Sequence, residues 1–174
     1  MADGIVHHIS ETGGIARFIP RQTLASEHRA SGKVVWAVGR EALPNYLLAR
    51  DCPRVTYRCS PVTTQADKTY FFGPSTASRV IAIDQQWFQR ATQSTIWIYD
   101  LSGATFECID LDAGHYVSHV EIVPVAIRHI ADPIAEMLQH DVELRFVRDL
   151  AGLQDEVAKS SLSFSSTRLR NLAT

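Results

Sequence analysis

The stretch KVVWAVGREALPNYLLARDCPRVTYRC, residues 33–59, decides the fold that the sequence predicts. An apolar strand over residues 34–38 is followed by a turn at Gly39, a short helix that begins at Pro44, and a second strand over residues 54–58. The arginines and large aromatic residues of this stretch are Arg40, Arg50, Arg54, Arg58, Trp36, Tyr46 and Tyr57. We interpret it as one wall of a pocket for a flat or anionic ligand. The alternative is an ordinary structural segment whose arginines face water.

The composition is that of an ordinary globular protein. With 174 residues, of which 45% are hydrophobic and 21% charged, the chain is long enough to bury a core, and we expect a single domain over residues 1–174. The net charge of −2 provides no overall positive field, so we do not expect the protein to bind duplex nucleic acid.

The cysteines and the N-terminal residues indicate the cellular compartment of the protein. Three cysteines, Cys52, Cys59 and Cys108, cannot all pair, and the absence of CxxC spacing favours free thiols in a reducing compartment. Residues 1–10 lack the basic and apolar regions of a signal peptide, and no apolar run is long enough for a membrane span. These features predict a cytoplasmic protein.

Short strands and short helices are expected on both sides of the opening stretch. The further strands are expected at residues 5–10, 78–83, 95–101, 105–109, 115–130 and 142–147. Pro124 predicts a bend or a sheet edge in the longest of them. Helices are expected after Thr64, after Asp84, after the pair Asp132-Pro133, and from Asp149 to the serine-rich tail, with Phe164 on the apolar stripe of the last one. The fold class is therefore α+β, rich in β-structure, with two small antiparallel or mixed sheets.

Polar residues on the expected strands and strand ends are the candidates for chemistry. His8, Tyr116 and Glu121 are the candidate catalytic residues, with Glu121 as the general base. The candidate substrate-binding residues are Ser10, Arg17, Tyr46, Arg50, Arg54, Ser118 and Arg168. For His8 the alternative is a buried histidine with a structural role, and for Glu121 it is a strand residue that faces water. Residues 21–32 are polar and aperiodic, which is typical of a mobile loop.

Other kinds of site find less support in the sequence. On one strand His115 and His119 would lie roughly 13 Å apart, too far to bind one metal ion, so we expect no metal site. The chain has no GxSxG and no phosphate-binding loop. Cys52 lies between Arg50 and Arg54, which could lower its pKa, but a buried structural cysteine is the favoured interpretation.

Four segments carry a resemblance to a known family. These are VHHISE near the N-terminus, VVWAVGREALPNYLLARDCPRVTY, GHYVSHVEIVPV and SSLSFSSTRLRN. Together they resemble a bacterial family of small proteins without an established activity, and RDCPR is the most specific of the shared motifs.

A more distant resemblance is to the ADP-ribosyltransferase-type fold, which includes RNA 2′-phosphotransferases. The resemblance implies that His8, with Ser10, contacts the ribose of NAD and that Tyr46 stacks on its nicotinamide. The sequence departs from this group at the strand that carries a catalytic glutamate in many members. Here His115 and Tyr116 stand in that region, and Glu121 lies several positions later.

The function that we expect is that of an enzyme acting on an NAD-like or nucleotide-like anionic substrate, by ADP-ribosyl or phosphoryl transfer, with NAD as a substrate. Two alternatives remain open. One is a non-catalytic module that binds a nucleotide or another anion. The other is an acid–base or metal-dependent enzyme of small-molecule metabolism that uses His8, His115 or His119.

Overall fold

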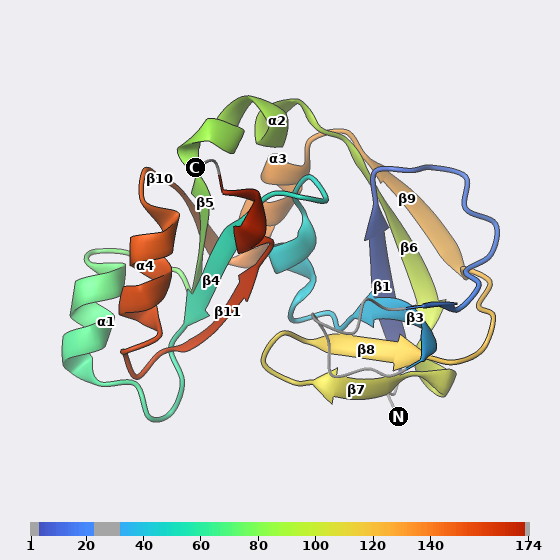
Figure 1. The fold of residues 1–174 in the computed structure, drawn as a ribbon, viewed down its shortest axis with the longest axis horizontal. Helices are drawn as coiled ribbons and strands as arrows, with labels where there is room; N and C mark the ends of the chain where they lie inside the picture. Colours follow the sequence, from blue (N-terminus) through green and yellow to red (C-terminus); the bar gives the residue numbers. More distant parts are fainter. Residues whose placement is uncertain (1–3, 23–31, 173–174) are drawn as a thin grey trace. The chain divides into compact units, whose positions relative to one another are not determined.

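Two sheets organise the structure, a computed structural model that describes residues 4–22 and 32–172 (Figure 1). The larger sheet is antiparallel and has the strand order β7-β8-β3-β1-β6-β9, with β2 pairing with β3. Its strands are β1 (Ile5–Ser10), β2 (Arg21–Gln22), β3 (Lys33–Val38), β6 (Ile96–Ser102), β7 (Glu107–Asp110), β8 (His115–Ser118) and β9 (Ala126–Ile130).

The smaller sheet has the order β10-β5-β4-β11, in which β10 and β5 are parallel and the other pairs are antiparallel. Its strands are β4 (Arg54–Arg58), β5 (Arg79–Asp84), β10 (Val142–Val147) and β11 (Ser163–Thr167). The helices are α1 (Gln65–Phe72), α2 (Phe88–Gln93), α3 (Pro133–Met137) and α4 (Leu150–Val157), with 3₁₀ turns η1 (Leu43–Tyr46), η2 (Gln85–Trp87), η3 (Gly103–Thr105), η4 (Leu138–His140) and η5 (Leu169–Asn171). The α+β class and the two small sheets are as predicted.

The chain divides into two compact units, and the predicted single domain stays a prediction. The first unit combines Met1–Tyr46 with Thr95–Ala131, and the second combines Leu47–Ser94 with Asp132–Thr174. The stretch from which the prediction began is therefore shared, since its first strand and helix belong to the first unit and its second strand to the second. Each unit has its own core, in which Val6, Tyr99 and Phe106 are buried in the first and Tyr57 and Leu150 in the second.

Local signals placed most of the elements correctly. The Thr64 side chain accepts a hydrogen bond from Asp67 N at the start of α1, and Gly73 ends that helix with a φ of 57°. Asp132 likewise accepts from Ala135 N at the start of α3. Pro124 lies between β8 and β9, so the one strand predicted over residues 115–130 is in fact two separate strands, and β9 lies at an edge of the larger sheet. These signals work because capping and turn chemistry depend on neighbours in the sequence.

Two other predictions about the chain also differ from the structure. The C-terminal helix is shorter than predicted, and Phe164 lies in β11, where it pairs with Tyr57 of β4. The pairing provides an inter-strand ladder that the sequence alone did not reveal. The predicted mobile loop over residues 21–32 begins as β2, and its residues 23–31 lie outside the described part of the chain.

Two further predictions concern thiols and membranes. Cys52, Cys59 and Cys108 are all free, as predicted. Among the described residues, no helix has both the length and the apolar character that a membrane crossing requires. The cytoplasmic location stays a prediction.

Gly114, at the turn between β7 and β8, provides a test of how closely this turn of the larger sheet is packed. Its φ is 66°, and a Cβ there would collide with the Ala42 side chain, whereas Gly14 has a φ of 70° and open space. We expect Gly114→Ala to lower the free energy of unfolding by about 2–5 kcal/mol, from the left-handed backbone and the overpacking together. The control Gly14→Ala carries only the backbone cost of about 1–2 kcal/mol. Urea unfolding measures the free energy of unfolding of both variants. Equal decreases in the two variants would contradict this account.

Candidate functional site

A row of side chains crosses one face of the larger sheet. The strand register pairs Asp100 of β6 with His7 of β1, His7 with Val38 of β3, and Val38 with His115 of β8. Directly paired residues of neighbouring strands point to the same face, so these four side chains form one line, which we call the His7 row. From the spacing of strands, the Cα atoms of His7 and His115 are about 10 Å apart. The row places ionisable groups among buried apolar residues of the sheet, such as Val38, Ile98 and Val117.

His7 is the most constrained member of the row. Its side chain is buried, and Nδ1 lies 2.8 Å from Asp100 Oδ1. Because a carboxylate can only accept, Nδ1 carries the proton in this hydrogen bond. Within residues 4–22 and 32–172, the other ring nitrogen, Nε2, has no hydrogen-bond partner, and no buried side-chain nitrogen or oxygen atom lacks one. Nε2 therefore reaches the surface of the unit, with its lone pair available to a ligand.

Arg128 extends the charged end of the row. It lies on β9, two residues from Ala126, which pairs with Asp100, so its side chain is on the same face. The distance from Arg128 Nη2 to Asp100 Oδ1 is 3.7 Å, and 43% of the Arg128 side chain is exposed. One carboxylate thus contacts both an imidazole and a guanidinium group, which keeps negative charge next to His7 and positive charge at the rim.

Aromatic residues surround the other end of the row. His115 Nε2 lies 2.6 Å from the phenol oxygen of Tyr46, which also donates to the Ala113 carbonyl at 3.1 Å. Trp36, on the same face of the sheet, meets the His115 ring edge to face at 5.5 Å. Tyr46 is the last residue of η1. It reaches the sheet because Gly39 N donates to the Gly114 carbonyl and holds the two turns together.

His8, the predicted ribose contact, lies on the opposite face of β1. Its Nδ1 donates to the Trp36 carbonyl at 2.8 Å, and its ring packs against Phe18 at 4.6 Å and near Tyr99. This environment agrees with the structural alternative for His8. Ser10, two residues along, accepts a hydrogen bond from Thr12 N. The substrate roles predicted for both residues stay predictions.

Tyr116 and Ser118 share that face with His8, since they pair with Ala37 and Val35 of β3. Ser118 is fully buried, and its hydroxyl lies 2.9 Å from Thr105 Oγ1. Burial raises the pKa of Tyr116, as does the hydrogen bond between its phenol and Cys108, so this phenol remains protonated at neutral pH. In its present contacts Tyr116 could donate a proton but not act as a base.

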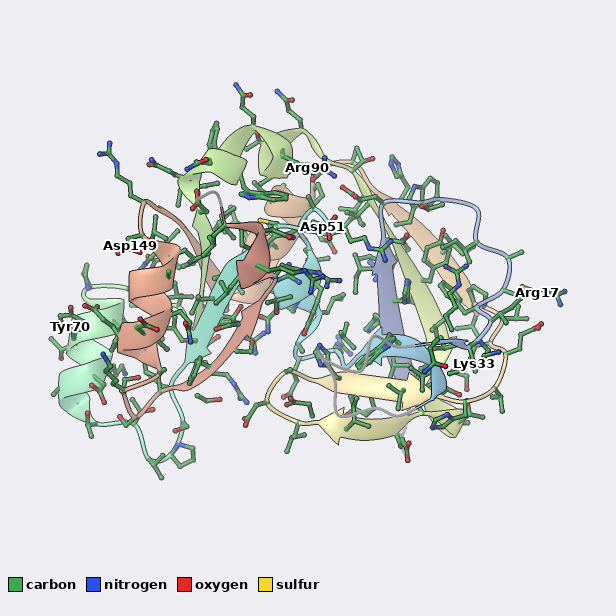
Figure 2. The ribbon with its side chains drawn as sticks, in the orientation of Figure 1. Arg17, Lys33, Asp51, Tyr70, Arg90 and Asp149 are labelled. Atoms are coloured by element: carbon green, nitrogen blue, oxygen red, sulfur yellow. The ribbon has the colours of Figure 1, made fainter. Side chains whose placement is uncertain are left out.

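Arg17 and Glu121 are brought together, with Arg17 Nη1 2.8 Å from Glu121 Oε1. Both side chains are largely in water, and Figure 2 shows Arg17 pointing away from the sheet. Such exposed pairs contribute little stability. The base role predicted for Glu121 would require it to leave this partner.

The three remaining candidates, Arg50, Arg54 and Arg168, belong to the second unit. Arg54 is buried and donates from Nη1 to the Cys52 carbonyl at 3.0 Å. Arg50 is exposed, and Arg168 Nε lies 3.8 Å from Asp51 Oδ1. Whether these arginines and the histidines of the first unit line one cavity stays a prediction.

The sequence did not single out His7, Asp100 and Arg128. The alternation of IVHHIS separates the two histidines onto opposite faces, but it does not say which face meets a carboxylate. Asp100 is 93 residues from His7, so its contact depends on the pairing of β1 with β6. In the part of the chain that the structure describes, no three His, Cys, Asp or Glu residues are grouped to hold a metal ion.

Comparisons with known proteins give one match. A family model described as "Family of unknown function (DUF6886)" matches residues 7–172. No curated protein and no solved structure matches the chain. The matched range includes the whole His7 row and every candidate residue that the sequence singled out.

Burial makes a testable prediction for the cysteine in the RDCPR motif. Desolvation raises the pKa of Cys52 to about 12, even with Arg54 opposing it, whereas Cys108 is exposed. At pH 8 only about one Cys52 side chain in ten thousand is then a thiolate. We expect iodoacetamide to label Cys108 in the folded protein and to label Cys52 only after unfolding, as measured by mass spectrometry. Rapid labelling of native Cys52 would contradict a structural role.

Proposed function

The chain belongs to the DUF6886 family of unknown function, and we propose that it is an enzyme acting on a nucleotide-like anionic substrate of the NAD type. The observation that carries the proposal is the imidazole of His7, which is oriented by Asp100 through Nδ1 and keeps Nε2 open. A buried histidine held by a carboxylate is suited to proton transfer rather than to packing alone.

The tautomer defines what His7 can do. With the proton on Nδ1 and Asp100 accepting it, Nε2 is the basic atom of a neutral ring. When Nε2 takes a proton from a substrate hydroxyl, Asp100 stabilises the imidazolium that forms. The residue therefore combines the two requirements of a general base, a free lone pair and a stabilised conjugate acid.

The neighbours of His7 support a nucleotide as the substrate class. Arg128 presents a partly exposed guanidinium, which pairs with phosphate oxygens. Trp36, Tyr46 and His115 present flat rings on which a base or a nicotinamide can stack. A molecule with an anionic group and an aromatic ring would thus find both partners along one face of the sheet.

The proposed reaction is group transfer to an acceptor hydroxyl. In ADP-ribosyl transfer, the acceptor oxygen bonds to the anomeric carbon of the ribose as the bond to nicotinamide breaks, and the acceptor proton passes to His7 Nε2. In a phosphoryl transfer the same base would take the proton of a hydroxyl whose oxygen bonds to phosphorus, as the bond from phosphorus to the leaving oxygen breaks and the leaving group departs as its anion.

The acid–base alternative, without a nucleotide, is also supported by the His7–Asp100 hydrogen bond, since the pair would serve any substrate hydroxyl. A non-catalytic module is less well supported, because binding alone does not require a second ring nitrogen that is kept open. Ligand screening distinguishes these cases before any turnover assay.

The first measurement is a thermal-shift and calorimetric screen with NAD, ADP-ribose, AMP and divalent cations. We expect NAD or ADP-ribose to stabilise the protein and Arg128→Ala to weaken that binding by on the order of tenfold. The control is His129→Ala, which changes the adjacent residue of β9 on the opposite face. If the Arg128→Ala and parent proteins bind NAD or ADP-ribose equally well, the His7 row is not the binding face.

The second measurement concerns His7. We expect His7→Asn and Asp100→Asn to bind NAD within a few-fold of the parent and to lower its turnover by about 10²–10⁴-fold, because the base is lost or misoriented. Nicotinamide release, followed by chromatography, reports turnover. Binding without turnover by the parent would favour the non-catalytic module, and unchanged turnover by His7→Asn would contradict the assignment of the base.

A further inference from the structure

We propose that the second unit carries its own binding site for a phosphate or pyrophosphate group, formed where the RDCPR motif meets the C-terminal segment. We call residues 50–54 and 168–171 together the arginine clasp. The clasp unites two motifs for which the proposed function has no use. This inference does not rest on the His7 row, which belongs to the other unit.

Three contacts hold the clasp together. The last pair of the β11–β4 ladder is Thr167 with Arg54, which brings the following residue, Arg168, beside the motif. Asn171 Nδ2 then donates to the Asp51 carbonyl at 2.8 Å, and Arg168 Nε lies 3.8 Å from Asp51 Oδ1. Figure 2 labels Asp51, whose backbone is one side of this contact.

Packing against the core of the second unit holds the clasp in place. Leu169 and Leu172 pack against the core of the second unit, and Cys52, in the middle of the motif, is fully buried. The polar residues between these anchors are thereby held at the surface. A site that is to recognise an anion needs such support, because freely moving arginines lose side-chain entropy when they bind.

The two segments of the clasp are rich in arginine, although the protein has a net negative charge. The clasp contains the four arginines 50, 54, 168 and 170 and one acidic residue, Asp51, whereas the whole chain has a net charge of −2. Arg50 and Arg170 are exposed, and Arg54 is only 5% exposed, so its charge is weakly screened by water. A local field of this kind attracts anions, and guanidinium groups match the geometry of phosphate oxygens.

The backbone of Arg168 is an independent sign of a specialised position. Its φ is 59°, in the left-handed region that side-chain-bearing residues rarely adopt. The turn is closed by Asn171 N, which donates to the Arg168 carbonyl at 2.9 Å. Strained residues of this kind persist where the surroundings fix them, and they are frequent in ligand-binding sites.

Asp51 is a weak partner of Arg168 within the clasp. Its distance of 3.8 Å from Arg168 Nε is too long for a hydrogen bond, and its side chain is 56% exposed. A phosphate offers more charge and more acceptor atoms than one carboxylate. We therefore infer that a phosphate displaces Asp51 from Arg168 on binding and that Asp51 lowers the affinity of the empty site.

The test uses inorganic pyrophosphate as the probe and the full chain as the protein. We expect calorimetric binding that weakens by on the order of tenfold in Arg50→Ala and in Arg170→Ala, which change exposed residues and leave the fold intact. The matched control is Arg148→Ala, an exposed arginine of the same unit outside the clasp, which should bind as the parent does. Amide chemical shifts should move in residues 50–52, in Arg54 and in residues 168–171.

A gain-of-affinity variant completes the test. Asp51→Asn keeps the backbone carbonyl that Asn171 contacts and removes the competing charge, so we expect it to bind pyrophosphate several-fold more tightly. His7→Asn should bind pyrophosphate as the parent does, which separates this site from the proposed base. No binding at millimolar pyrophosphate, shifts confined to other residues, or equal weakening by Arg148→Ala would each overturn the inference.

Discussion

The pairing of β1 with β6 is the constraint on which the chemistry of the first unit depends. All six residues of β1 are in register with β6, from Ile5 opposite Ser102 to Ser10 opposite Trp97. This register places His7 opposite Asp100 and, on the other face, His8 opposite Tyr99. A slip of one residue would exchange the two faces, so that the imidazole beside the carboxylate would become the one that packs among aromatic rings. The different environments of two adjacent histidines are thus a direct consequence of strand register.

Burial then requires each polar group on the sheet to have a hydrogen-bond partner. A buried ring nitrogen without a partner is unfavourable by roughly 1–3 kcal/mol, so His8 bonds the Trp36 carbonyl and His7 bonds Asp100. These two hydrogen bonds differ in their effect on the imidazole ring. A carbonyl partner fixes a ring in place, whereas a carboxylate partner also stabilises the protonated ring. That difference is why the proposal of catalysis rests on His7, although the two histidines are neighbours in the sequence.

The sequence predicted the local elements well because their signals are local. Thr64 and Asp132 hydrogen-bond within three residues, and Pro124 lies in the segment that separates β8 from β9. The error at Phe164 and the omission of His7 both involve distant partners. Phe164 was assigned to a helix because its pairing with Tyr57 lies outside any local window, and the His7 site was missed because its carboxylate is 93 residues away. Alternation separated the two histidines, but only the strand order shows which neighbour each one meets.

The division into units also constrains how the protein can fold. The chain passes between the units after Tyr46, after Ser94 and after Ala131, so each unit is assembled from two separate segments. A unit of this kind cannot form from one continuous piece of chain, because β1 and β3 need β6, and β4 and β5 need β10 and β11. Each unit can form only when its two segments come together, so the folding of each depends on contacts between residues that are distant in the sequence.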